Sequence, residues 1–255
     1  MRNSVRSIFP MLAAITFLLA SFAFSGTAFA SMTEDKALKI IQSLAPDAKI
    51  ISYKSAPLGL TEVGFTSKGQ TGILYLDKDG KYILMGALLD VATKKNITKD
   101  RFDELTRVNP SDIPLADAIV VGDPKAKNKI IVFSDPDCPY CTRLQGEIEK
   151  VVKQRKDIAF FIKLFPLKSI HPDSYRKSKA IACEKNNAKA LKMLEDAYAK
   201  KDIPKPSCDT TVVDDNLALG TKYAISGTPT LIFPNGSRGS GMAAYDIIEQ
   251  VDAKK

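Results

Sequence analysis

The segment that decides the fold is residues 129–144, KIIVFSDPDCPYCTRL. Its first part, Lys129 to Phe133, is the apolar and β-branched run that a buried strand shows. From Leu144 onward, apolar residues recur every three or four positions through Ile148 and Val151, which predicts a helix. A C-x-x-C motif, residues 138–141, therefore lies between a predicted strand and a predicted helix.

The start of a helix is a chemically special place for a cysteine. The free N–H groups and the helix dipole stabilise an anion there, and the thiolate is the form of cysteine that attacks disulfides. Pro139 suits the first turn because its missing N–H would have had no helical partner. Cys141 lies three residues further on the same face, close enough to close a small ring with Cys138. We predict that Cys138 is the nucleophile and Cys141 the resolving thiol.

A C-x-x-C motif can also bind zinc, attach haem or form a purely structural disulfide. A zinc site needs two more ligands, but the chain has a single histidine, His171, and two widely separated further cysteines. Haem attachment needs C-x-x-C-H, and Thr142 follows Cys141. A structural bridge stays open, although a helix start is the geometry that makes a disulfide reactive. The sequence therefore predicts neither a metal nor a cofactor.

The other two cysteines, Cys183 and Cys208, have no helix-start context. Pairing them would connect a helical segment to the loop around Pro204 and Pro206. A loop of this size contributes roughly 3 kcal/mol in the chain-entropy model. We predict a structural disulfide between them.

Three polar residues near the motif have two open roles each. Asp135 and Asp137 flank Cys138 and could relay protons to Cys141 if buried, although turn and cap roles are favoured. His171 precedes a proline and could donate a proton, although a surface or capping role is favoured. We leave all three outside the predicted site.

After the motif, strands and helices alternate. A strand is predicted over 158–165, and Gly227-Thr228-Pro229 leads into another over 230–233. Helical patterns cover 173–200, 212–223 and 245–253. This order is an α/β plan.

The preceding chain has a different pattern, that of an α+β domain. Thr33 can cap a helix that Pro46 ends, and four short β-like runs follow at 49–53, 61–66, 72–76 and 82–85. Asp77 to Gly80 form a predicted hairpin turn, and residues 87–92 could extend the sheet. A domain of this size has a marginal core and often gains stability by pairing, for which an exposed edge strand offers a surface.

Between these parts, Thr98 could cap a helix that runs through Val108. Three prolines follow within residues 109–128, and proline cannot continue a helix. We therefore divide the chain into a signal peptide (1–30), an N-terminal domain (31–97), a linker helix and linker (98–128) and a C-terminal domain (129–255).

The first 30 residues have the layout of a cleaved secretory signal, with Arg2 and Arg6, an apolar run and a small-x-small site at 28–30. An uncleaved membrane anchor is the alternative interpretation of this segment.

The net charge of +8 comes from scattered lysines, and the chain lacks the clustered basic surface that is typical of a nucleic-acid-binding protein.

From Ile130 onward the chain resembles the thioredoxin fold, although Asp137 stands where thioredoxin itself has Trp. Cys-Pro-Tyr-Cys, the helical insert carrying Cys183 and Cys208, and Gly227-Thr228-Pro229 before a strand are together similar to the DsbC/DsbG family of periplasmic thiol:disulfide interchange proteins. The runs 72–77 and 79–81, with Gly86 and Asp90-Val91, are similar to that family's dimerisation domain.

The resemblance implies a cystatin-like N-terminal dimerisation domain, a linker helix and a thioredoxin-like domain, assembled as a V-shaped periplasmic homodimer. Thr228 and a cis-Pro229 would lie beside Cys138 and hold a substrate strand, with Tyr140 also in substrate binding. The implied activity is disulfide isomerisation of misfolded or oxidised secreted proteins, with chaperone-like binding of unfolded chains and a DsbD-type membrane reductase as electron donor. The Pro-Tyr dipeptide is that of the DsbG branch, which leaves a DsbG-like reductase of single oxidised cysteines as the alternative. An oxidase is a third possibility, although it would not need a dimeric N-terminal domain. A holdase without redox activity is the alternative from a different class.

Overall fold

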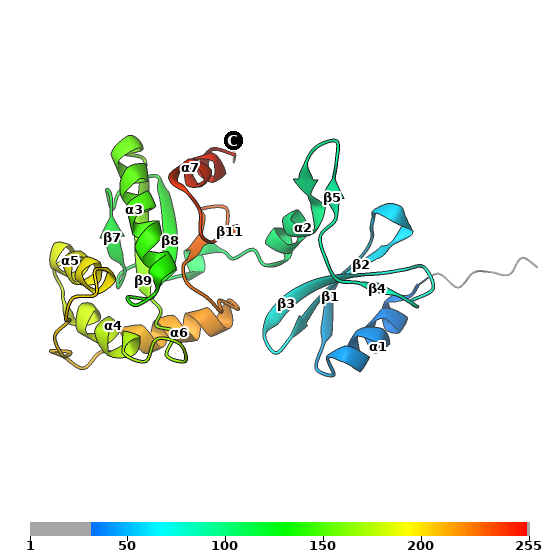
Figure 1. The fold of residues 1–255 in the computed structure, drawn as a ribbon, viewed down its shortest axis with the longest axis horizontal. Coiled ribbons are helices and arrows are strands. Elements are labelled where there is room, and N and C mark those ends of the chain that lie inside the picture. The colour runs from blue at the N-terminus through cyan, green and yellow to red at the C-terminus, as the bar shows by residue number, and fades with distance from the viewer. Residues whose placement is uncertain (1–31, 254–255) are drawn as a thin grey trace, which may run out of the picture. The chain divides into compact units, whose positions relative to one another are not determined.

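The computed structural model of the chain describes residues 32–253 (Figure 1). The predicted signal peptide lies outside these residues. Within them, no helix has the length and apolar character needed to span a membrane. The described chain consists of an N-terminal α+β part and a C-terminal α/β part, which confirms the predicted fold class.

The N-terminal part packs one helix on an antiparallel sheet. Helix α1 (Glu34–Leu44) starts where the Thr33 hydroxyl accepts a hydrogen bond from the Lys36 amide, as predicted. The sheet has the order β1 (Lys49–Ser55), β2 (Thr61–Ser67), β3 (Gln70–Leu76), β4 (Ile83–Leu84), with a 3₁₀ turn at Pro57–Gly59 between β1 and β2. Ala37 and Ile41 of α1 pack on Val63, Leu74 and Leu76 of the sheet.

The predicted hairpin between β3 and β4 is present. Gly80 adopts a φ of 66°, which its missing side chain permits. The Asp77 carboxylate accepts hydrogen bonds from the amides of Lys81 (2.7 Å) and Tyr82 (2.8 Å), which fixes the turn. Strand β4 is only two residues long and forms one end of the sheet.

Two N-terminal expectations were wrong. Residues 87–92 do not extend the sheet, since β5 (Leu89–Asp90) pairs only with β6 (Lys95–Asn96) in a separate ribbon. Helix α2 (Ile97–Leu105) is capped by Asn96 and ends three residues before Val108. Thr98 lies inside its first turn, where its hydroxyl contacts the Tyr75 hydroxyl and accepts a hydrogen bond from the Leu88 amide.

Helix α2 packs on the N-terminal sheet through a buried ion pair. Arg101 bonds Glu62 at 2.9 Å and the Ser52 hydroxyl at 3.1 Å. The predicted linker helix is therefore tied to strands β1 and β2.

The C-terminal part is built on a five-stranded sheet of order β11-β10-β8-β9-β7. Strands β8 (Asn128–Ser134) and β9 (Ile158–Leu164) are parallel, and β10 (Thr230–Ile232) and β7 (Ile119–Val121) run antiparallel to them. Strand β11 (Arg238–Gly239) pairs with β10. The helices are α3 (Pro139–Gln154), α4 (Ser174–Cys183), α5 (Asn187–Tyr198), α6 (Val212–Lys222) and α7 (Ala244–Asp252), and a 3₁₀ turn covers Pro110–Asp112.

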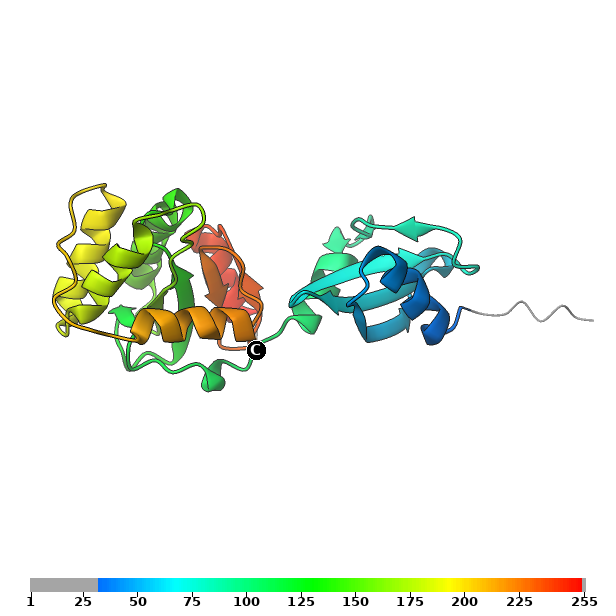
Figure 2. The same cartoon turned by 90° about the horizontal axis from the view of Figure 1, so that it is seen from below.

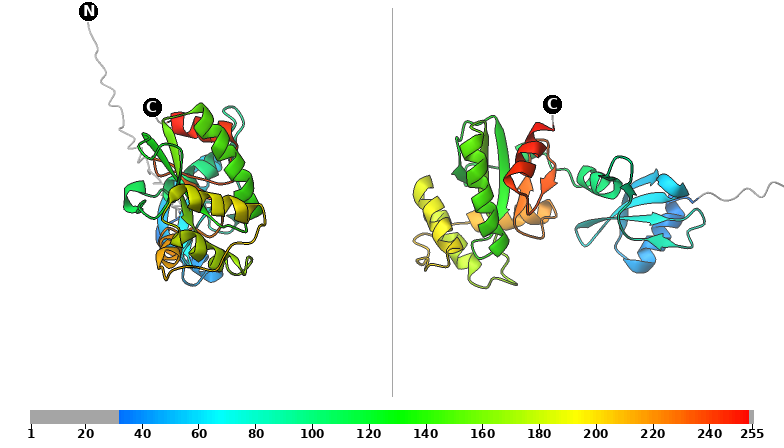
Figure 3. Two further views of the ribbon diagram at one scale, coloured as in Figure 1. Left: turned by 90° about the vertical axis from the view of Figure 1, so that its left-hand side faces the viewer. Right: turned by 45° about the horizontal axis from the view of Figure 1, so that its top comes forward.

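Alternation along β8 distributes its side chains between two cores. Ile130 and Val132 pack with α3, α5 and α7, whereas Ile131 and Phe133 pack with the α6 side. Helices α3 and α7 lie side by side, as two views show (Figures 1 and 3). Helix α6 lies on the other side of the strands from α3 (Figure 2). A sheet covered on both faces explains why β8 and β9 are apolar almost throughout.

Two C-terminal expectations also differ from the structure. Strand β7 lies inside the stretch predicted to be linker, yet it completes the edge of this sheet beside β9. The helical pattern over 173–200 is two helices, because α4 ends at Cys183 and Asn186 caps α5 by accepting a hydrogen bond from the Lys189 amide.

Candidate active site

The C-x-x-C motif forms the first turn of α3. Cys138 is the N-cap residue and Pro139 the first helical residue, as the sequence predicted. The Cys138 carbonyl accepts hydrogen bonds from the amides of Cys141 and Thr142. Asp135 makes the bend between β8 and α3, because its carboxylate accepts a hydrogen bond from the Asp137 amide at 2.8 Å.

The two thiols of the motif are unbonded and differ in acidity. A hydrogen bond from the Cys141 thiol is the largest cause that lowers the pKa of Cys138, to about 5. The nearby Thr228 side chain and the amides at the start of α3 also lower the pKa of Cys138, against the effect of burial. At neutral pH Cys138 is therefore a thiolate, the form that attacks disulfides.

Cys141 has the opposite character. Burial and the neighbouring Cys138 sulfur raise its pKa, while the Asp135 amide and the Ser134 hydroxyl oppose that rise. The residue is 1% exposed, against 3% for Cys138. Cys141 therefore keeps its proton at neutral pH.

The loop before β10 lies against Cys138. The Thr228–Pro229 bond is cis, and the Cys138 sulfur lies 3.4 Å from the Thr228 carbonyl oxygen. The Thr228 hydroxyl is buried and has no hydrogen-bond partner among the described residues. The structure therefore brings Thr228 and Pro229, both predicted for the site, next to the thiolate.

Tyr140 lies on the outer side of the motif. Its side chain is 60% exposed, and the Arg143 guanidinium stacks on its ring at 5.4 Å. Together with Leu144 and Met242 it lines a cavity of about 370 Å³. Arg143 and Glu147 also line this cavity, and a largely apolar hollow next to the C-x-x-C motif suits a side chain of a bound polypeptide.

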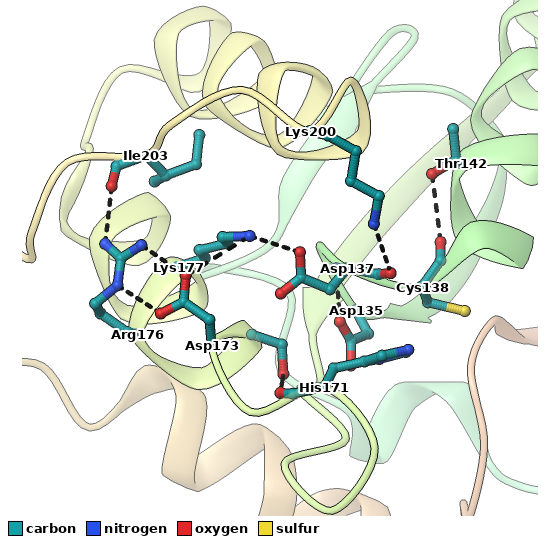
Figure 4. A network of polar contacts seen from close by, with 11 residues as sticks. Asp135, Asp137, Cys138, Thr142, His171, Asp173, Arg176, Lys177, Lys200 and Ile203 are labelled. Atoms are coloured by element: carbon teal, nitrogen blue, oxygen red, sulfur yellow. Dashed lines mark hydrogen bonds and ion pairs between the residues drawn. The ribbon is translucent and has the colours of Figure 1, made fainter.

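Asp135 is a fully buried carboxylate that sequence reasoning left between two roles. Besides the hydrogen bond from the Asp137 amide, it accepts one from the Leu167 amide at 2.6 Å. It also contacts His171 Nδ1 at 2.9 Å, and both residues are drawn in Figure 4. It therefore fixes the turn before Cys138 and connects that turn to the loop after β9. His171 is accordingly a partner of this carboxylate. The sequence favoured a surface or capping role, and with a side chain only 18% exposed the surface role does not hold.

Asp137 links the active-site turn to the helical segment. Its carboxylate pairs with Lys177 of α4 at 2.6 Å, and its carbonyl accepts a hydrogen bond from Lys200 just after α5 (Figure 4). Sequence reasoning missed both lysines, because the pairs are 40 and 63 residues apart along the chain.

Cys183 and Cys208 form a disulfide with a Cα–Cα distance of 5.6 Å. It joins the last residue of α4 to the loop before α6, so α5 lies within the closed loop. Residues 32–253 contain no group of three or more histidine, cysteine or acidic side chains arranged to hold a metal ion.

Both parts of the chain match family models. Residues 115–253 match the thioredoxin-like domain, and residues 28–99 match the N-terminal domain of disulfide bond isomerase proteins. The first match alone covers more than half of the 255 residues.

Curated relatives agree with these family matches. A probable thiol:disulfide interchange protein DsbC of Bordetella avium (strain 197N) is 31% identical over 209 residues, 82% of this chain and 70% of the relative. The thiol:disulfide interchange protein DsbC of Escherichia coli (strain K12) is 30% identical over 216 residues, 84% of each. A disulfide interchange protein from Neisseria gonorrhoeae is 34% identical, and the match covers 56% of this chain and 97% of that one, with a TM-score of 0.46.

Proposed function

Because the chain belongs to the DsbC family of thiol:disulfide interchange proteins, we propose that it is a disulfide isomerase of the periplasm. Its substrates are misfolded or oxidised secreted proteins. The observation that carries the proposal is the pairing of a Cys138 thiolate, with its pKa lowered to about 5, and a protonated Cys141 beside it. The match of residues 28–99 to the N-terminal domain of isomerase proteins supports this assignment over that of a simple oxidase.

The reaction starts with Cys138. Its thiolate attacks one sulfur of a wrong disulfide, forms a mixed disulfide and releases the other substrate sulfur as a thiolate. A second substrate thiolate then displaces Cys138, which completes the isomerisation. Alternatively Cys141 displaces the substrate, which leaves a Cys138–Cys141 disulfide and a reduced product. After that outcome a reductant must restore both thiols, and we assign this task to a membrane reductase of the DsbD type.

Substrate binding is assigned to the surface around the thiolate. The Thr228–Pro229 loop, in contact with the Cys138 sulfur, would hold an extended substrate segment by backbone hydrogen bonds. The cavity beside Tyr140 would take an apolar side chain of that segment. Affinity for exposed apolar side chains also supports a chaperone-like activity on unfolded chains.

We further propose a homodimer formed by the N-terminal part. Strand β4 leaves one edge of its sheet open, and an open edge is a surface for pairing. Large apolar side chains are exposed on and after this strand: Leu84, Met85, Leu89 and Val91. Export through the segment 1–30, removed as a signal peptide, would place the dimer in the periplasm.

The direct test is reactivation of scrambled ribonuclease by the reduced protein. The proposal predicts catalysed recovery of ribonuclease activity, and none with the Cys138→Ser/Cys141→Ser double variant. A holdase without redox activity would rescue equally well with that double variant.

The second candidate is a DsbG-like reductase of single oxidised cysteines, favoured by the Pro139-Tyr140 dipeptide. A protein carrying one sulfenylated cysteine distinguishes it when assayed in parallel. Reduction of that protein without ribonuclease reactivation would replace isomerisation by this function.

A further inference from the structure

The residue before Cys138 carries a carboxylate that is largely withdrawn from water. Asp137 pairs with the ammonium of Lys177, in α4, at 2.6 Å (Figure 4). The side chain of Asp137 is 13% exposed and that of Lys177 15%, so solvent and salt screen the pair much less than they screen charges on an open surface. Without its partner, this carboxylate would disfavour a second negative charge on the next residue, because like charges repel.

Another carboxylate near the start of α4 could compete for Lys177. The Asp173 carboxylate lies 3.7 Å from the Lys177 ammonium, a longer contact than that to Asp137. Both oxygens of Asp173 bind the Arg176 guanidinium, at 2.7 and 2.8 Å, and Arg176 also donates a hydrogen bond to the Ile203 carbonyl at 2.8 Å (Figure 4). Because Arg176 occupies Asp173, the short contact of Lys177 is free to form with Asp137.

The other charged groups around this turn bind elsewhere. Asp135 is held by two backbone amides and by His171. The Lys200 ammonium, on the exposed side, donates to the main-chain carbonyl of Asp137 at 3.2 Å, so it ties the backbone of the turn to the end of α5. Among residues 32–253, Lys177 is therefore the cation that forms an ion pair with the Asp137 carboxylate.

The remaining elements around Cys138 bring no second anion to it. On α3, the Arg143 guanidinium stacks on the Tyr140 ring. The loop before β10, residues 225–229, contacts the Cys138 sulfur through the Thr228 carbonyl and has no charged side chain. The charge of Asp137 is thus the one that must be compensated next to the nucleophile.

Given the proposed thiol–disulfide exchange, we propose that Lys177 is a positioning residue that acts through Asp137, whose charge it compensates so that Cys138 stays a thiolate. The effect enters isomerisation twice. Cys138 first attacks as a thiolate. A substrate thiolate then attacks the substrate sulfur of the mixed disulfide, the new substrate disulfide forms, the bond to Cys138 breaks, and its electron pair stays on the Cys138 sulfur. A more stable thiolate leaves faster in that second step.

The test measures the thiolate of Cys138 directly. Reduced full-length protein is alkylated with iodoacetamide from acidic to alkaline pH, and mass spectrometry follows the Cys138 peptide, because only the thiolate reacts. We expect Lys177→Met to move the midpoint of this pH profile up by about 0.5 to 1 pH unit. Asp137→Asn should move it down by a smaller amount, since Asp173 still compensates Lys177 in part.

Further variants separate charge from packing. Lys177→Arg keeps the charge and should restore the wild-type midpoint. The double variant Asp137→Asn/Lys177→Met removes both charges and should also titrate close to the wild-type protein, whereas lost packing would not give opposite shifts in the two single variants. Lys179→Met is the matched control, because it removes a lysine of the same helix whose ion pairs are with Asp209 and Asp214. Its midpoint should be unchanged.

Unchanged midpoints in Lys177→Met and Asp137→Asn, or shifts of the same sign in both, would overturn the inference. Asp137→Asn is nearly isosteric and decides the matter by itself if Lys177→Met does not fold, since a midpoint that fails to move down contradicts the role of the carboxylate. Failure of the wild-type protein to reactivate ribonuclease would instead overturn the proposed function, while the midpoints would still decide whether Lys177 protects the thiolate.

Discussion

At the scale of single residues, the chemistry depends on an asymmetry between two cysteines three positions apart. Cys141, Thr228 and the start of α3 lower the pKa of Cys138. Burial and the neighbouring Cys138 raise the pKa of Cys141, which therefore stays protonated. The sequence predicted the first half of this asymmetry, because a helix start favours a thiolate wherever it occurs. It could not predict the buried hydrogen bond between Ser134 and Tyr198, because Tyr198 comes 64 residues after Ser134 and only the folded chain joins them.

The lowered pKa of Cys138 has a consequence for stability. A group whose pKa falls on folding stabilises the folded state above its unfolded pKa, and this contribution disappears as the pH falls through the folded value. An unfolded cysteine titrates near a pH of about 8.5, and folded Cys138 titrates at about 5. The free energy of unfolding of the reduced protein should therefore rise between these two values relative to that of Cys138→Ser, in urea titrations at several pH values. Parallel curves for the two proteins would contradict the lowered pKa.

At the scale of secondary structure, periodicity predicted the long elements well and the short ones poorly. The apolar spacing of α1 and α3 and the β-branched run of β8 gave elements close to those observed. Strand β7 was missed because three residues are too short for a pattern and lie among prolines. The break between α4 and α5 contains no glycine or proline; its only signal is Asn186, which acts as a cap.

The disulfide Cys183–Cys208 should stabilise helix α5. It closes the loop that contains α5, and a loop of 25 residues contributes about 3 kcal/mol in the chain-entropy model. We expect Cys183→Ala/Cys208→Ala to lower the free energy of unfolding in urea by about that amount, with the Cys138–Cys141 pair kept reduced in both proteins. A loss below about 1 kcal/mol would mean that packing of α5 alone holds the segment.

At the scale of the whole molecule, the two parts divide the work. All four cysteines lie in the C-terminal part, and the described N-terminal residues 32–105 contain neither cysteine nor histidine. Their sheet contributes an open edge and exposed apolar side chains. The α+β and α/β sequence patterns predicted this division. The pairing of β5 with β6 could not be predicted, because strands of two residues are too short to show a sequence pattern.

Dimerisation should depend on the exposed apolar residues that follow β4 in the chain. Met85 is 75% and Val91 90% exposed, and exposed apolar patches mark protein–protein contacts, so we expect Met85→Lys/Val91→Lys to give a monomer in sedimentation velocity. The monomer should keep the attack by Cys138 but lose ribonuclease reactivation. Leu44→Lys, at the exposed end of α1, is the control and should stay dimeric. A dimeric double variant would place the interface elsewhere.

The central claim is that Cys138 attacks and Cys141 resolves, and trapping of the mixed disulfide tests it most directly. Cys141→Ser protein is incubated in its reduced form with scrambled ribonuclease, quenched with acid and analysed by non-reducing gel and mass spectrometry. The account predicts a ribonuclease adduct linked through Cys138, at far higher yield than with wild-type protein and absent from Cys138→Ser protein. No adduct with Cys141→Ser, or an adduct through Cys141 in the Cys138→Ser protein at equal yield, would contradict it.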